Sequence, residues 1–202
     1  MWNDDFHHSA VVALTGRSEA YYSDYRGSAV EFFSCAKWGF LYQGQHYAWQ
    51  RKRRGQPGLD VLPEQFVLFL ENHDQVANSA RGQRLHQVAS PARLRALTAF
   101  MMLTPGTPML FQGQEFHCSA PFLFFADHGA DLSTLVRKGR AEFLSQFPSL
   151  VSAEAQALFA DPSSRQTFER CKLSLEERER NHEVLHFYRE LIAVRRALFS
   201  SY

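Results

Sequence analysis

The sequence predicts an α/β fold built on parallel strands, and three features of its 202 residues indicate this. Residues 66–70 (FVLFL) form an apolar run only five residues long, which is typical of a strand buried on both faces of a parallel sheet. Residues 108–111 (PMLF) form a second short run, and a helical pattern lies between the two. Each run ends in a polar cluster, at 71–75 and at 112–115.

Strand, helix and strand in this order indicate a parallel (β/α)8 barrel, because the active site of such a barrel collects at the carboxyl ends of its strands. Two or three strands cannot close a barrel, and a complete one takes about 250 residues. We therefore expect a partial TIM barrel that holds only the last strands and helices, is rich in helix and carries an extended loop insertion. We also expect the sequence to be truncated at its amino end.

The segment before the first run is predicted to hold two helices and a loop. Residues 2–16 (WNDDFHHSAVVALTG) place acidic and imidazole groups before a short apolar stretch that Gly16 ends, as in a loop leading into a brief helix. Residues 28–42 carry apolar side chains at three- and four-residue steps, which predicts an amphipathic helix that begins near a serine cap. RKRRGQPG (51–58) is predicted to be an exposed loop whose charge serves solvation rather than a partner.

The chain after residue 90 is predicted to be mostly helical. Pro91 begins a helix that Pro105 and Gly106 end. Residues 117–175 lack clear periodicity in places, so we expect an elaborated loop region with short helices. Residues 181–199 have strong helical spacing and predict a final amphipathic helix.

Composition and charge exclude several classes of protein. With 45% apolar residues the chain can bury one core, so it is not a disordered tail. Its 22 basic and 21 acidic residues leave a charge of +1, which draws in neither nucleic acid nor an anionic membrane, whereas a neutral sugar is compatible. Three widely spaced cysteines, Cys35, Cys118 and Cys171, argue against a disulfide framework or a zinc site. We expect a soluble cytoplasmic protein without a signal peptide or membrane span.

Two polar segments carry the chemical signal. In the pentad 71–75 (ENHDQ), a carboxylate and an imidazole at the mouth of a buried strand are costly unless something uses them. From composition alone, a structural hydrogen-bond network explains the pentad equally well. The opening W-N-D-D-F-H-H holds two aspartates and two histidines that could bind a divalent ion. Adjacent residues seldom converge on one centre, so we expect no metal.

A buried strand followed by Asn-His-Asp resembles the fourth signature region of the α-amylase clan of glycoside hydrolases. Within that clan, the chain is most similar to the maltooligosyltrehalose trehalohydrolase family, and the resemblance covers nearly all of it. The motifs that carry it are W-x-D-D-F-H-H at 2–8, L-T-G at 14–16, Y-Y-x-D at 21–24, N-H-D-Q-V at 72–76, TPGTPMLFQGQEF at 104–116 and PFLFFADH at 121–128. Two positions depart from the family pattern. Gln50-Arg51 follows Trp49 where an aromatic residue followed directly by arginine is expected, and Ala77 stands where glycine is usual.

The resemblance implies a role for each of several residues. Asp74 would be the third catalytic carboxylate, which binds hydroxyls of the cleaved sugar and stabilises the oxocarbenium-like transition state, while His73 would donate a hydrogen bond to a neighbouring hydroxyl. Tyr22 and Trp49 are candidate sugar platforms, with core packing as the alternative for each. Glu115 would bind substrate or brace the pocket. The residues expected around the trehalose end are Asp4, Asp5, His7, His8, Gln75 and Asn78.

The resemblance also implies the reaction. The substrate would be maltooligosyltrehalose or a related α-glucan, whose α-1,4-glucosidic bond next to the terminal trehalose is hydrolysed without a cofactor, in trehalose biosynthesis. Retaining hydrolysis needs a nucleophile and a proton donor about 5–5.5 Å apart, and in this clan both lie upstream of residue 2. We therefore expect residues 1–202 to be the carboxyl-terminal portion of the catalytic domain, inactive alone and in need of the missing amino-terminal half. The alternatives are a non-catalytic glucan-binding module and a branching or debranching relative.

Overall fold

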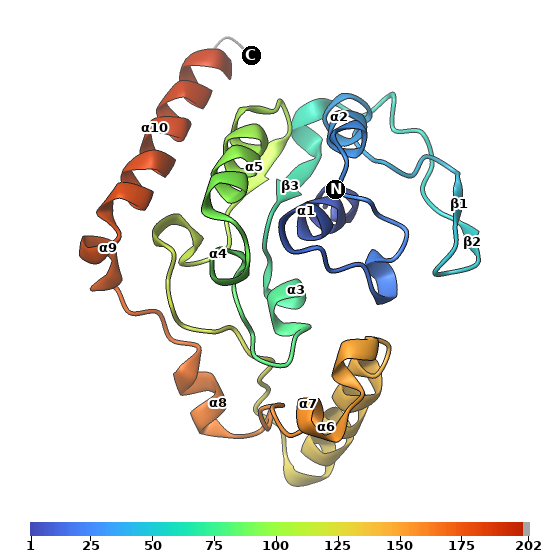
Figure 1. The fold of residues 1–202 in the computed structure, drawn as a ribbon, viewed down its shortest axis with the longest axis vertical. Coiled ribbons are helices and arrows are strands. Elements are labelled where there is room, and N and C mark those ends of the chain that lie inside the picture. The colour runs from blue at the N-terminus through green and yellow to red at the C-terminus, as the bar shows by residue number, and fades with distance from the viewer. Residues whose placement is uncertain (200–202) are drawn as a thin grey trace.

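A computed structural model describes residues 1–199, and two parallel strands lie at its centre (Figure 1). Val67–Phe69 (β3) pairs in parallel with Thr107–Met109 (β4), with Leu68 opposite Pro108. Both predicted strands are confirmed, although β4 begins one residue earlier and ends two residues earlier than its apolar run. The helix between them, Pro91–Leu103 (α5), is confirmed as well. The chain thus has a helix-rich α/β fold with a parallel crossover.

The amino-terminal residues form a third parallel segment on the other edge of β3. Trp2 makes a parallel bridge to Val67. Val67 exchanges backbone hydrogen bonds with Met1 and Asn3, at 2.7 and 2.9 Å, whereas the Phe66 carbonyl accepts one from residue 107 at 2.8 Å. Successive residues of a strand bond to opposite neighbours, so β3 lies in the middle. The prediction that the chain opens as a loop is therefore wrong for these residues, which extend along β3 before the first helix begins.

The predicted helices before β3 exist with shifted ends. Asp4–Thr15 (α1) begins where the Asn3 side chain accepts a hydrogen bond from a backbone amide at 3.0 Å, and it ends at Gly16 with φ 72°. Ala29–Trp38 (α2) is four residues shorter at its end than predicted, because Gly39 adopts φ 85° and breaks the helix. His46–Tyr47 (β1) and Lys52–Arg53 (β2) form an antiparallel hairpin, so the loop predicted at 51–58 is wrong over β2.

The remaining helices are mostly short. The final predicted helix is confirmed as His182–Phe199 (α10). None of the helices within residues 1–199 is both long and apolar enough to cross a membrane. The other α-helices are His73–Ala77 (α3), Leu85–Val88 (α4), Ala130–Leu144 (α6), Ala153–Gln156 (α7), Arg165–Arg170 (α8) and Glu177–Arg180 (α9), and the 3-10 helices are Ala20–Tyr22 (η1), Pro63–Gln65 (η2), Gln114–Phe116 (η3) and Pro148–Leu150 (η4).

One hydrophobic core joins these elements. Leu68 of β3 packs in the same buried cluster as Phe6 of α1 and Met101 of α5. Helix α10 lies along α5 and holds the turn before β4 in place. The Arg195 guanidinium on α10 donates hydrogen bonds to four backbone carbonyl groups between residues 102 and 106. The acceptors are the carbonyl oxygens of Met102, Thr104, Pro105 and Gly106.

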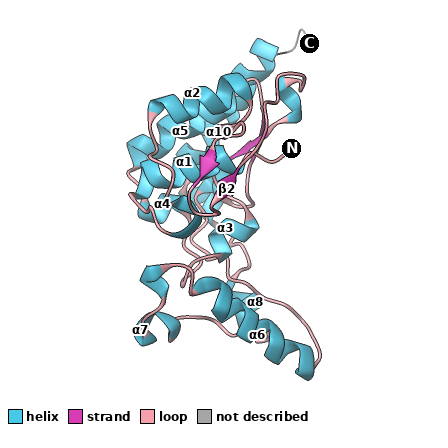
Figure 2. Cartoon of the chain, turned by 90° about the vertical axis from the view of Figure 1, so that its right-hand side faces the viewer, coloured by secondary structure: helices cyan, strands magenta, loops and turns pink. Residues whose placement is uncertain are grey.

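Helices α6, α7 and α8 form a lower lobe below the body that holds the strands (Figures 1 and 2). The expectation of only short helices in 117–175 is wrong for α6, which has 15 residues. Its side chains are largely exposed, and only Leu144 at its end is buried. The apolar side chains of α6 nevertheless recur at helical spacing, at Leu132, Leu135, Val136 and Phe143, so the pattern is present in the sequence and the expectation overlooked it.

Candidate active site

The polar pentad after β3 divides into a buried half and an exposed half. Glu71 and Asn72 are buried. The Glu71 carboxylate accepts a backbone amide hydrogen bond, and burial raises its pKa. The Asn72 side chain accepts from the Gln75 amide at 2.8 Å and thereby starts α3. The next side chains, His73 and Asp74, are 57% and 68% exposed, so the pentad both braces the strand end and presents a carboxylate outward.

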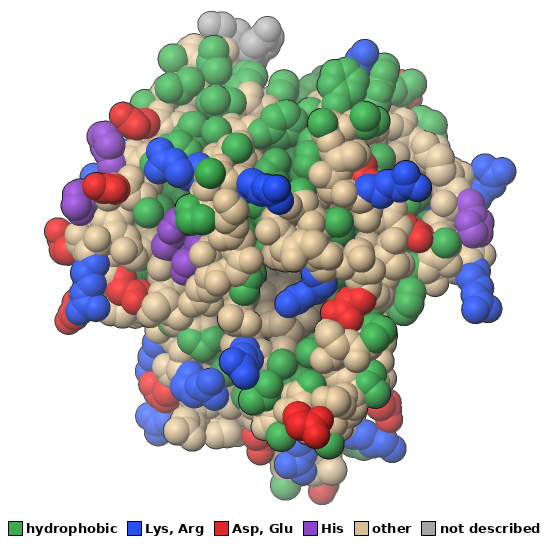
Figure 3. All heavy atoms as spheres, in the orientation of Figure 1, with side chains coloured by type: hydrophobic (Ala, Val, Ile, Leu, Met, Phe, Trp, Pro, Cys, Tyr) green, Lys and Arg blue, Asp and Glu red, His purple; other side chains and the backbone are tan. Residues whose placement is uncertain are grey.

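Asp74 faces a cavity of about 580 Å³ that lies between the carboxyl end of β3 and the lower lobe. Figure 3 shows the molecule hollowed between its upper body and the lower lobe, with basic and acidic side chains at the rim. The wall of this cavity consists of Asp4, His8, Tyr21, Trp49, Gln50, Arg54, Asp74, Gln75, Asn78, Arg140, Phe143 and Gln146. The residues outside this wall, among those that the sequence singled out, are Asp5, His7, Tyr22, His73 and Glu115.

The two neighbouring aspartates of α1 have different surroundings. Asp4 is half-buried on the cavity wall, and its pKa is raised by burial and by the charges of Asp5 and Asp74, against the opposing effect of Arg54. Asp5 is buried and forms an ion pair of 3.2 Å with Arg54. It also accepts the Tyr25 hydroxyl hydrogen bond at 2.6 Å. Asp4 is therefore the member of the pair that can meet a ligand.

The two histidines of α1 are both buried, but only His8 lines the cavity. His7 is buried, and its Nδ1 donates to the Leu70 carbonyl at 2.7 Å, which ties α1 to the end of β3. Burial lowers the pKa of His7 to about 4. The His8 ring lies on the cavity wall 5.1 Å from the Tyr21 ring, and burial lowers its pKa as well. Both ring nitrogens of His8 are buried and have no hydrogen-bond partner within residues 1–199.

A hydrogen-bonded row of side chains crosses the floor of the cavity. The Asn78 amide donates to the Tyr21 hydroxyl at 3.2 Å, and that hydroxyl donates to Gln75 Oε1 at 2.8 Å. The Tyr22 hydroxyl reaches the same oxygen at 3.2 Å from the buried side. Tyr22 is only 4% exposed, so in this structure Tyr21 and not Tyr22 presents its ring to the cavity. Because Tyr21 and Tyr22 are adjacent and identical, the sequence alone does not predict which of them lines the cavity.

The β1–β2 hairpin brings Trp49 and Arg54 to the cavity. Trp49 lies in its turn, is 41% exposed, and is held by a hydrogen bond from its amide to Asp24 Oδ2 at 3.0 Å. Arg54 follows β2 and was grouped in the sequence with a solvated basic loop, although it binds the buried Asp5. A run of four basic residues in the sequence gives no sign that one of them meets a distant carboxylate, so the role of Arg54 could not be predicted.

His73 opens into a different space from its neighbour Asp74. Its Nε2 lies 3.4 Å from Asp74 Oδ1, but its ring lines a separate cavity of about 710 Å³ with Phe111, Phe122 and Phe168 among the other lining residues. The two residues therefore stand between two hollows. Glu115 lies half-buried in η3 and lines neither of them.

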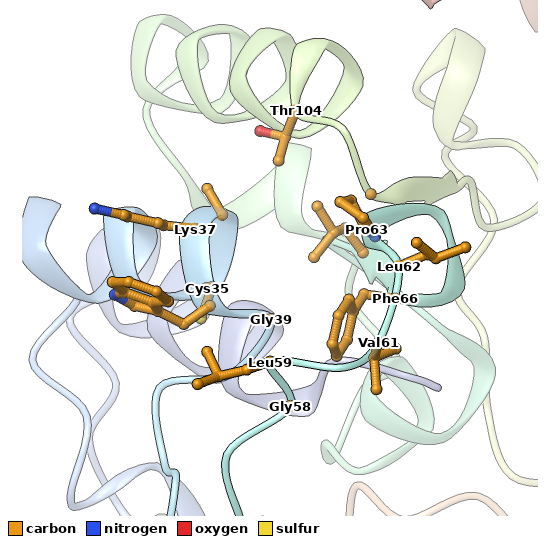
Figure 4. Close-up of a pocket in the computed structure, with 14 residues that line it drawn as sticks. Cys35, Lys37, Gly39, Gly58, Leu59, Val61, Leu62, Pro63, Phe66 and Thr104 are labelled. Atoms are coloured by element: carbon orange, nitrogen blue, oxygen red, sulfur yellow. The ribbon is translucent and has the colours of Figure 1, made fainter. Parts of the chain in front are cut away.

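A third cavity, of about 310 Å³, lies at the amino end of β3 and has a mostly apolar wall (Figure 4). Trp38, Leu62 and Phe66 belong to its wall, which holds no carboxylate and no imidazole. The wall also holds Cys35 and Lys37. Burial raises the pKa of the Cys35 thiol, and the Lys37 ammonium packs over the Trp38 ring at 4.6 Å. Within residues 1–199 there is also no cluster of three or more histidine, cysteine or acidic side chains placed to hold a metal ion. Of the cavities described above, the one at the carboxyl end of β3 has two carboxylates, Asp4 and Asp74, in its wall.

The chain is similar to several curated proteins over almost its full length. Proteins named malto-oligosyltrehalose trehalohydrolase match it at 38% identity over 200 residues in Deinococcus radiodurans, at 34% over 196 residues in Saccharolobus solfataricus and at 34% over 200 residues in Mycobacterium tuberculosis. These matches cover 96–97% of this chain but only 32–33% of each relative. The chain thus spans about a third of the length of the curated relatives it matches. No family model matches it.

The fold is also similar to a solved structure. A crystal structure of a protein described as an alpha amylase, from Salmonella typhimurium, superposes with a TM-score of 0.86 at 37% sequence identity. The match covers 97% of this chain and 33% of the solved one. The helix-rich α/β architecture is therefore that of a part of an alpha-amylase-like protein.

Proposed function

We propose that this chain forms the sugar-binding carboxyl-terminal part of a malto-oligosyltrehalose trehalohydrolase. The premise is its similarity to about a third of each such protein that it matches. The parent reaction is hydrolysis of the α-1,4-glucosidic bond next to the terminal trehalose of maltooligosyltrehalose. The products are trehalose and a maltooligosaccharide. The proposal needs no cofactor.

One observation carries this proposal: Asp74 is an exposed carboxylate at the end of a buried parallel strand and faces a cavity lined by sugar-compatible groups. Oxocarbenium-like transition states carry positive charge, which a carboxylate stabilises. The wall of the same cavity also holds the amide side chains of Gln75 and Asn78 and the Trp49 ring, and aromatic faces pack well against the apolar faces of pyranose rings.

The residue roles follow from where the side chains lie. Asp74 is proposed as the transition-state stabiliser, and His73 beside it as a donor to a neighbouring sugar hydroxyl. The side chains proposed to bind the trehalose end are those on the cavity wall that are not buried, namely Asp4, Trp49, Gln75 and Asn78. The side chains proposed to support that wall, since they are buried, are Asp5, His7, His8 and Tyr22. Glu115 is proposed to brace the end of β4.

We further propose that the three parallel segments are the last strands of a (β/α)8 barrel and that 117–175 is an elaboration on its carboxyl-terminal face. Two features support this placement. The polar clusters that follow β3 and β4 lie at the same end of the strands, where barrels carry their active sites. The lower lobe meets the body at this end, since Arg140 and Phe143 of α6 line the cavity that holds Asp74.

The 202 residues alone are proposed to bind glucan rather than to cleave it. Retaining hydrolysis needs a nucleophile and a proton donor in addition to the stabilising carboxylate. The cavity wall holds two carboxylates, Asp4 and Asp74, and therefore falls one short of the three groups. A non-catalytic glucan-binding role is for this reason the second candidate for the chain by itself.

Binding of defined oligosaccharides tests the proposal. In an NMR titration of the chain, maltotriosyltrehalose is expected to shift the Trp49 indole signal, while a β-1,4-linked tetrasaccharide of glucose leaves it unchanged. Trp49→Ala is expected to weaken binding, whereas the same change at Trp38, in the apolar cavity, is not. Stronger binding of an α-1,6-branched glucan than of maltotriosyltrehalose would favour the branching or debranching reading instead.

A further inference from the structure

The lower lobe contributes a side of the Asp74 cavity that no motif predicts. Arg140 and Phe143 stand three residues apart on α6, so they share one helix face, and both line the cavity. Gln146 follows the end of α6 and lines it as well. The lobe is also held to the body by the Glu19 carboxylate, which accepts from the Ser149 amide at 2.9 Å.

Arg140 is fastened beside the candidate catalytic turn. Its Nη1 donates to Asn78 Oδ1 at 2.7 Å, and its Nη2 donates to the Ala77 carbonyl at the end of α3. The guanidinium also lies 4.9 Å from the centre of the Phe124 ring. A guanidinium has five N–H donors, and these bonds use two of them. The other three N–H donors of Arg140 are not used by these bonds, and Arg140 lines the cavity.

No carboxylate neutralises Arg140 within the part of the chain that the structure describes, where it takes part in none of the ion pairs of 4.0 Å or less. Burial lowers its pKa against the opposing effects of Tyr21 and Asp74, and both of these residues line the same cavity as Arg140. A partly buried guanidinium with unused donors lacks acceptors there, and sugar hydroxyl oxygens are acceptors of suitable size.

We propose that Arg140 is a further sugar-binding residue, which donates to hydroxyl oxygens of the glucan end that binds beside Asp74. This inference rests on the proposed function and extends it, since it makes the 117–175 elaboration a wall of the sugar site. The bonds to Asn78 and Ala77 hold the guanidinium rigidly, so its free N–H groups point in fixed directions and select hydroxyls by position.

The test compares the affinities of the chain for trehalose and its monodeoxy analogues. Arg140→Gln is expected to weaken trehalose binding about tenfold or more, the loss typical of a hydrogen bond to a charged group. Arg137→Gln on the same helix is the matched control, because Arg137 is exposed and pairs with Asp161, and it is expected to change nothing. For the wild type, one monodeoxy analogue is expected to bind more weakly than trehalose, because it lacks the hydroxyl that Arg140 contacts. For the Arg140→Gln chain, the same analogue and trehalose are expected to bind equally.

Equal trehalose affinity of Arg140→Gln and wild type would overturn the proposal, as would identical deoxy losses in both chains. Should Arg140→Gln fail to fold, the arginine Nε–H signals of the wild type decide: the Arg140 signal is expected to shift with the trehalose concentration, and a constant signal under saturating sugar contradicts the proposal. A wild-type chain that binds trehalose without help from Arg140 leaves the proposed function standing. A wild-type chain that binds no α-glucan overturns both.

Discussion

The Arg54 guanidinium lies 3.2 Å from the buried Asp5 carboxylate, and this pair gives the two neighbouring aspartates of α1 different tasks. Asp5 also accepts hydrogen bonds from the amides of Leu41 and Tyr42, at 3.1 and 2.9 Å. It therefore joins α1 to the segment that leads into the β1–β2 hairpin, and through Arg54 to the hairpin's far strand. Asp4, one residue earlier, faces the cavity.

Replacing each aspartate by asparagine separates the two tasks. Asp5→Asn removes one partner of a buried ion pair, so we expect the free energy of unfolding to fall by about 3 kcal/mol. Asp4→Asn is expected to change it by less than about 1 kcal/mol, because the pKa of Asp4 is already raised by burial, but to weaken sugar binding. Urea unfolding and sugar titration of both variants check this. Equal destabilisation by the two changes would contradict the assignment.

His7 is expected to make the chain sensitive to acid. The unfolded side chain takes up a proton near pH 6.5, whereas burial holds the pKa of folded His7 near 4, so its contribution is complete above pH 6.5 and is lost as the pH falls towards 4. The loss is about 3 kcal/mol for a difference of that size. Urea unfolding at pH 7 and pH 4.5 is the measurement.

The matched variants are His7→Asn, whose amide can still donate to the Leu70 carbonyl, and His46→Asn at an exposed site. Asp4 and Glu71 have raised pKa values and titrate with the opposite sign, but both remain in each variant, so the difference between variants isolates His7. We expect a smaller loss of stability on acidification in His7→Asn than in His46→Asn. An equal loss of unfolding free energy in both variants would contradict the claim that His7 is buried in its neutral form.

Two glycines are expected to respond to alanine in opposite directions. Gly82 has φ +60° and a Cβ there would lie 2.5 Å from the Phe122 carbonyl oxygen, so Gly82→Ala should destabilise the chain by about 2 kcal/mol or more. Gly139 lies inside α6 with open space around it, so Gly139→Ala should stabilise by about 0.5–1 kcal/mol. Thermal unfolding of both variants is sufficient. The same sign for both would contradict the loop geometry at Gly82.

The sequence predicts those parts of this fold that local pattern determines. Short apolar runs identify β3 and β4, and strong periodicity identifies α10. The hairpin has too short a pattern to be recognised, because β1 and β2 have two residues each and depend on each other. The length of α6 was not predicted although its apolar side chains recur at helical spacing. Sequence periodicity depends only on residues close together in the chain, so it does not predict elements that are stabilised mainly by long-range contacts.

The same division runs through the candidate site. Asp74 is marked in the sequence by its position after a buried strand, and it does face a cavity. Arg140 belongs to the cavity only because its helix folds back over 62 residues of sequence to reach Asn78. Burial likewise decides between adjacent candidates, and it places Tyr21 rather than Tyr22 at the surface of the cavity. Spacing in the sequence holds none of this information.

The purified chain is expected to release no trehalose from maltooligosyltrehalose above a buffer control. The reason is that its cavity lacks a full set of catalytic carboxylates. Chromatography of the products after prolonged incubation is the measurement. Trehalose release that disappears in Asp74→Asn would show that the described residues hold a complete active site and would contradict this expectation.

The most direct test of the central claim is the affinity of the chain for a cationic piperidine iminosugar, which mimics the positive charge of the oxocarbenium-like transition state, before and after Asp74→Asn. Because Asp74 is exposed, this change should leave the stability within about 0.5 kcal/mol. Our account predicts that Asp74→Asn weakens iminosugar binding about tenfold while Glu142→Gln, an exposed control on α6, has no effect. Unchanged iminosugar affinity in a folded Asp74→Asn chain would contradict it.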